Sequence, residues 1–160
     1  MAAAMPWRCG LVLLTLVLHS QEPPVIPGIQ WDAAGRATIR VPSAPDTYSV
    51  LFRGDEIPFI ETPAALERET PIPEGHWVEL TDPESPLQDD ARFYRVAWFP
   101  IATPGDVDDD GLDDLFEVRW SPDLDPLNSG DALLDPDQDY RSTVEEFRDG
   151  TDPFAFNEPT

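Results

Sequence analysis

The acidic side chains between Asp106 and Glu117 are spaced as the ligands of one metal ion would be. The run reads Asp-Val-Asp-Asp-Asp-Gly-Leu-Asp-Asp-Leu-Phe-Glu and fits the calcium-loop pattern at every fixed place. Ca²⁺ takes about six to eight oxygens, so twelve residues can supply them only if the chain turns sharply. Gly111 makes such a turn at little steric cost. The predicted ligands are these side chains, with the carbonyl in the case of leucine: Asp106, Asp108, Asp110, Leu112, Asp114 and Glu117.

A solvated acidic loop is the alternative interpretation of this run. It would place acidic residues anywhere, whereas here they alternate and are followed by glycine, an apolar residue and a closing glutamate. The order of residue types therefore favours a calcium site.

A second acidic run repeats the first at an offset of 29 residues, which predicts two paired units. Tyr140 stands where the pattern has glycine, and a non-glycine residue in a left-handed conformation costs on the order of 1 kcal/mol. The second loop is therefore expected to bind more weakly, to use another geometry or to bind nothing. Its predicted ligands, with the carbonyl in the case of arginine, are Asp135, Asp137, Asp139, Arg141, Thr143 and Glu146.

The 160-residue chain has a net charge of −22, with ten Arg and no Lys. From Pro104 onward, 18 acidic residues stand against three Arg, a net charge of −15. A protein this acidic repels nucleic acid and anionic membranes, so both are excluded as partners. The negative charge also opposes folding of the loops unless a cation neutralises it.

Residues 1–20 are predicted to be a secretory signal peptide, with Arg8 before the apolar core Gly10–Leu18 and cleavage near Ser20. A membrane anchor is the alternative, but this core is shorter than the ~20 residues that span a bilayer. After cleavage no membrane span and no cysteine would remain, because Cys9 is the only one. We therefore expect a secreted protein, extracellular or on a cell surface, without disulfides.

The rest of the chain is predicted to hold a β-domain and the calcium repeats, joined by short linkers. The expected boundaries are a proline-rich linker at 21–27, the β-domain at 28–100, a linker at 101–105 and the repeats at 106–160. Alternating apolar residues predict strands at Ile29–Asp32, Arg36–Val41, Tyr48–Arg53, Ile57–Ile60, His76–Thr81 and Arg92–Phe99.

Three helical segments are also expected. One helical turn is predicted at Ala64–Glu69, and a short helix after each loop at Leu112–Arg119 and Ser142–Asp149. The two later helices are too short to be stable alone, so we expect their apolar faces to pack on each other, with Trp120 and Leu134 alongside.

The predicted β-domain resembles a shortened fibronectin type III domain. The resemblance rests on the strand Tyr48-Ser-Val-Leu-Phe-Arg, the turn Leu80-Thr-Asp-Pro and the strand Phe93-Tyr-Arg-Val. It implies a mainly β fold, a small β-sandwich followed by a calcium-bound coil with two short helices.

The segment Asp106–Asp152 resembles the thrombospondin type 3 repeats of secreted bacterial proteins. The resemblance is carried by the first loop and by Asp125-Pro-Leu-Asn, Asp131-Ala, Asp135-Pro-Asp, Glu145-Glu-Phe and Gly150-Thr-Asp-Pro. It implies that acidic side chains wrap calcium ions in a region with little other core. It also implies that ligands of neighbouring ions are found among Asp123, Asp125, Asp131 and Asp152.

The sequence carries no catalytic constellation. After signal cleavage His76 is the only histidine, and nucleophile, phosphate-loop and zinc-protease motifs are absent from the sequence. We therefore expect a calcium-binding, non-enzymatic structural or adhesion module whose partners are calcium ions and a cell-surface or extracellular protein or glycan.

Other functions remain open from the sequence. A carbohydrate- or protein-binding module would use Trp31, Trp77 and Trp98 as a stacking face if all three were exposed on one sheet. A dockerin-like pairing module is disfavoured by the closing glutamates and the Gly150-Thr-Asp-Pro ending. A calcium sensor would need helices that open on binding, and the predicted helices are too short for that.

Overall fold

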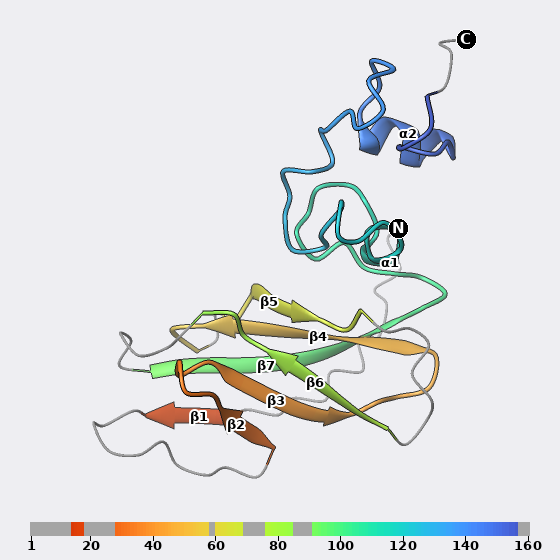
Figure 1. Ribbon diagram of the computed structural model, residues 1–160. Helices are drawn as coiled ribbons and strands as arrows, with labels where there is room; N and C mark the ends of the chain where they lie inside the picture. Colours follow the sequence, from red (N-terminus) through yellow and green to blue (C-terminus); the bar gives the residue numbers. More distant parts are fainter. Residues whose placement is uncertain (1–13, 18–27, 58–59, 69–75, 85–90, 157–160) are drawn as a thin grey trace, which may run out of the picture. The chain divides into compact units, whose positions relative to one another are not determined.

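A computed structural model describes residues 14–17, 28–57, 60–68, 76–84 and 91–156 (Figure 1). The chain divides into two compact units, Met1–Thr103 and Pro104–Thr160. The first unit contains all the described strands and the second contains both described helices. The fold is therefore mainly β.

Two antiparallel sheets make up the N-terminal unit (Figure 1). One has the strand order β1-β7-β4-β5 and the other the order β2-β3-β6. The strands are β1 Leu14–Val17, β2 Ile29–Trp31, β3 Ala37–Pro42, β4 Thr47–Gly54, β5 Thr62–Leu66, β6 Trp77–Thr81 and β7 Ala91–Pro100.

One hydrophobic core takes side chains from both sheets. Strand β3 shows why: Ile39 and Val41 are buried, while Arg40 between them is exposed. Because side chains alternate along a strand, this pattern gives the sheet one apolar face. The remaining core residues are Ile29, Ala37, Leu51, Ala64, Val78, Leu80, Tyr94 and Val96.

The structure confirms strands at five of the six predicted places, within one or two residues, and corrects two predictions. The described ends of the predicted strand Ile57–Ile60 are not strand residues, since Ile57 lies in an exposed bend and Ile60 lies outside the strands; the two residues between them fall outside the described part. The predicted helical turn at Ala64–Glu69 is also wrong, because Ala64 and Leu66 belong to β5. Both are buried, so core packing and pairing with β4 outweigh local helical preference.

Most of the predicted signal peptide lies outside the described residues. Within it, Leu14–Val17 forms the edge strand β1, which pairs antiparallel with Ala91–Tyr94 of β7. Among the described residues, no helix is long and apolar enough to cross a membrane.

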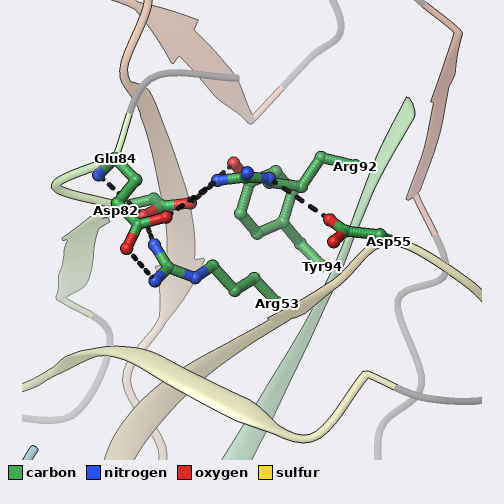
Figure 2. Close-up of polar contacts among 6 residues, drawn as sticks. All are labelled: Arg53, Asp55, Asp82, Glu84, Arg92 and Tyr94. Carbon is green, nitrogen blue, oxygen red and sulfur yellow. Dashed lines mark hydrogen bonds and ion pairs between the residues drawn. The ribbon is translucent and has the colours of Figure 1, made fainter. Parts of the chain in front are cut away.

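A buried carboxylate organises the polar end of the N-terminal unit (Figure 2). Asp82 is fully buried, and its Oδ1 accepts from the guanidinium of Arg53 at 2.6 Å. Its Oδ2 accepts from the Tyr94 hydroxyl at 3.0 Å and from Arg92 at 3.4 Å. Burial, followed by the nearby Asp82 charge, raises the pKa of Tyr94, which therefore stays a neutral donor. This network holds β6, β4 and β7 together and satisfies the buried charge.

Helices α1, Asp114–Arg119, and α2, Thr143–Asp149, frame the core of the C-terminal unit. The α1 N-terminus is capped by Asp113, which accepts from Phe116 N at 2.7 Å. Gly150 ends α2 in a left-handed conformation with φ 73°, where glycine avoids the cost of a side chain. Both helices begin one or two residues later than predicted.

The predicted packing between the helices is confirmed. The ring centroids of Phe116 and Phe147 lie 4.7 Å apart, and those of Trp120 and Phe154 lie 5.0 Å apart. Leu134 does not join them, contrary to the prediction, and its side chain is 51% exposed. Ala132 enters the core in its vicinity instead. The buried residues of this core are Leu112, Leu124, Ala132 and Val144.

Candidate metal centre

The first acidic loop is folded by its own carboxylates. Asp106 accepts hydrogen bonds from Asp110 N at 3.1 Å and from Gly111 N at 3.0 Å. Asp110 in turn accepts from Leu112 N at 2.8 Å. Gly111 has φ 96°, the left-handed conformation that the loop pattern predicts for this place. The backbone therefore turns where the sequence indicates.

The carboxylates of this region form two clusters that share one residue. The loop group consists of Asp106, Asp108 and Asp110, and the inner group consists of Asp110, Glu117 and Asp131. In each group, one oxygen from every member lies within 4.8 Å of the others. We call the two groups together the first centre. It brings together four of the predicted first-loop residues and adds Asp131.

Several oxygens of the first centre are buried without a hydrogen-bond partner. Glu117 is 0% exposed, and neither of its carboxylate oxygens has such a partner. The same holds for both oxygens of Asp108, for Asp110 Oδ2 and for Asp131 Oδ1. Burying a charged group without a partner costs several kcal/mol, so the arrangement calls for a proton or a cation.

The pKa values of these carboxyl groups reflect the same cost of burial. Burial, reinforced by the charges of Asp108 and Asp110, raises the pKa of Glu117 to about 9. Burial and the neighbouring carboxylates also raise the pKa of Asp108 to about 7, and the pKa of Asp131 is raised mainly by burial. These residues fit a hard cation, because all the side-chain donors are carboxylate oxygens.

Two predicted ligands of the first loop have other visible roles. Asp114 is buried at the start of α1, where its Oδ1 accepts from Val107 N at 2.9 Å. It lies outside both ligand groups, and place nine of such loops often acts through water. Leu112 places its side chain in the core, and its predicted carbonyl contact stays a prediction.

The second loop repeats the fold of the first. Asp135, Asp137 and Asp139 form a third ligand group, the second-loop group. Asp135 accepts from Asp139 N at 3.2 Å and from Tyr140 N at 3.0 Å, as Asp106 does from Asp110 and Gly111. This group corresponds to places one, three and five of the predicted loop.

The other predicted ligands of the second loop lie outside this group. Glu146 is buried on α2, where its Oε1 accepts from the Thr151 hydroxyl at 3.1 Å. The Thr143 hydroxyl donates to the Leu134 carbonyl at 3.1 Å, and the guanidinium of Arg141 pairs with Asp149. The second loop therefore presents three carboxylates together, with Glu146 held separately.

Tyr140 adopts the strained conformation predicted from its place in the loop. Its φ is 76° and its side chain is 93% exposed, so the ring contributes little packing to offset the strain. We expect Tyr140→Gly to stabilise the C-terminal unit by about 0.5–1 kcal/mol, after allowing for the greater freedom of glycine in the unfolded chain. Urea unfolding in excess calcium measures this difference.

Tyr140→Ala is the matched control for that variant. It removes the ring but keeps a Cβ, so it should not reproduce the gain. Equal stability of the glycine and alanine variants would show that strain at this position is negligible.

The three tryptophans considered as a stacking face do not form one. Trp31 lies on β2 and Trp98 on β7, in different sheets, and both are partly buried against the core. Trp77 is 55% exposed, and the guanidinium carbon of Arg40 lies 5.2 Å from the centroid of its ring. The stacking-face alternative therefore lacks the arrangement that it requires, because alternation along the strands turns two of the rings inward.

Asp131 is the member of the first centre that the loop pattern does not contain. It follows Glu117 by 14 residues, and only the Asp131-Ala element of the repeat resemblance indicated it.

No protein-family model, curated protein or solved structure matches this chain. Its function has to be inferred from the carboxylate clusters themselves.

Proposed function

We propose that the C-terminal unit binds calcium and that the protein is a non-enzymatic, calcium-stabilised extracellular module with a structural or adhesive role. The observation that carries the proposal is the burial of Glu117. Its side chain is fully buried beside other carboxylates, and neither of its oxygens has a hydrogen-bond partner. A buried charge of this kind is tolerated when a cation neutralises it.

The donor set favours calcium over other metals. The described clusters offer carboxylates and contain no histidine or cysteine, the ligands that select zinc or copper. Calcium accommodates more oxygens and looser geometry than magnesium, which requires a near-ideal octahedron. Glu117, Asp108 and Asp110 would hold the ion with Asp106 and Asp131, and the ion would supply the positive charge that offsets their repulsion.

A structural role follows from the small apolar core of this unit. Four buried apolar side chains and helices of six and seven residues give little hydrophobic stabilisation. Metal binding would add RT ln(1 + [Ca]/Kd), about 2.7 kcal/mol when calcium is at 100 times Kd. Extracellular modules typically bind calcium at about 10⁻⁴–10⁻³ M, which suits the secreted location that we propose.

The finer assignments are part of the same proposal. The two sheets with a common core support a fibronectin type III-like sandwich for the N-terminal unit. The repeated carboxylate loops support a thrombospondin type 3-like coil for the C-terminal unit. The β-unit would present or space the calcium-bound unit at a cell surface.

Thermal unfolding in calcium, magnesium and EDTA tests the proposal. We expect a transition of the C-terminal unit that moves up by several degrees in millimolar calcium, with a smaller shift in magnesium. Identical transitions in calcium and EDTA would contradict it.

A further inference from the structure

Asp131 lies outside the first calcium-loop pattern but turns its carboxylate into the first centre. Its Oδ2 accepts from Asp125 N at 2.8 Å and lies 3.5 Å from the Asn128 amide nitrogen. Its Oδ1 is buried without a hydrogen-bond partner, within the inner group that includes Glu117. One oxygen is thus oriented by the backbone, and the other is left for the centre.

The residues after Asp131 hold the start of α2. The Ala132 carbonyl accepts from Val144 N at 3.0 Å, and the Leu134 carbonyl accepts from Thr143 N at 2.8 Å. Leu134 N in turn donates to the Asp131 carbonyl at 3.0 Å. Residues 131–134, which we call the strap, therefore connect the first centre to the N-terminus of α2.

The first loop also contacts α2 directly. A Cβ on Gly111 would lie 3.3 Å from the Val144 Cγ2, which shows how closely the turn approaches this helix. Phe116 of α1 contacts Phe147 of α2. Because α2 directly follows the second-loop group and carries Glu146, its position affects the geometry of the second loop.

The repeat resemblance already implies Asp131 among the calcium ligands, and its free Oδ1 lies within the inner group. From these contacts we infer that an ion bound there raises, through Asp131 and the strap, the calcium affinity of the second loop. The inference rests on the proposed calcium function. Asp131 belongs to the first centre, and the strap is hydrogen-bonded to the N-terminus of α2. Helix α2 carries Glu146, the last residue of the second-loop pattern. Calcium binding to the two loops is therefore positively coupled, and by linkage each occupied loop favours the other.

The test is calcium binding to the full chain, measured by competition with a chromophoric chelator, which counts bound ions. We expect two ions in the unmodified protein, with positive cooperativity. Asp131→Asn keeps an oxygen that can accept from Asp125 N but removes the charge. It should weaken the first event by about tenfold or more and the second by about fivefold or more.

Asp109→Asn is the matched control. Asp109 is exposed in the first loop, lies outside all three ligand groups and has φ 62°, which asparagine tolerates, so this variant loses the same charge without removing a member of the centre. It should bind calcium as the unmodified protein does. Circular dichroism of both variants in excess calcium checks that they are folded.

The outcomes separate the two proposals. Asp131→Asn with unchanged binding would overturn the role of Asp131 while leaving calcium binding in place. Weakening of the first event alone, or a single ion in the unmodified protein, would overturn the coupling. Absence of any bound ion in the unmodified protein at millimolar calcium would overturn both the proposed function and this inference.

Discussion

Glu117→Gln is expected to stabilise the C-terminal unit in EDTA and to destabilise it in calcium. Without metal, Glu117 can be buried only by taking up a proton, because its pKa is raised to about 9, or by keeping its charge among other carboxylates; the neutral amide avoids both costs. With calcium, it would remove the closing two-oxygen ligand of the proposed site and weaken calcium binding. The effect of Glu117→Gln on stability is expected to change sign between the two conditions only if Glu117 binds a cation.

Hydrogen exchange of the backbone amides in residues 104–156 measures this effect in the C-terminal unit alone. Protection of the variant should exceed that of the unmodified protein in EDTA and fall below it in millimolar calcium. Asp109→Asn is the control, because Asp109 is exposed in the same loop, lies outside the ligand groups and has φ 62°, a conformation that asparagine tolerates. Loss of protection by Glu117→Gln in both conditions would mean that Glu117 is an ordinary packing residue.

Asp82→Ala is expected to cost the N-terminal unit about 3–5 kcal/mol of unfolding free energy. The reason is the charge left behind: Arg53 and Arg92 are largely buried and both pair with Asp82. Tyr94 would lose its acceptor as well. Urea unfolding in excess calcium measures the loss while the other unit stays loaded.

Asp55→Asn is the control for this network. Asp55 is exposed and lies 3.8 Å from Arg92, so its pair should be worth less than about 1 kcal/mol. If Asp82→Ala costs no more than Asp55→Asn, the buried network does not hold the sheets together.

The strands with strict alternation could be predicted from the sequence, and β5 could not. In β3 the residues Ile39 and Val41 show the period of two directly. In β5 the run Thr-Pro-Ala-Ala-Leu carries little β preference, and the strand is fixed by pairing with Val50 to Arg53 of β4. Tertiary pairing is not visible in a local pattern.

The same distinction applies to the candidate site. Loop geometry is local, so Gly111 and Tyr140 take the left-handed conformations that the pattern predicts. Asp131 joins the first centre through the fold of the inter-loop segment, which the loop pattern does not contain. Leu134 was expected in the core for its apolar character. Its side chain is exposed instead, and its carbonyl accepts a hydrogen bond from Thr143 N at the start of α2.

Calcium titration calorimetry of the protein beside an Asp106→Asn, Glu117→Gln variant tests the central claim most directly. We expect saturable binding with Kd near or below about 10⁻³ M, and loss of the first event in the variant. No heat at millimolar calcium, together with unchanged melting in EDTA, would contradict the claim that calcium holds this unit together.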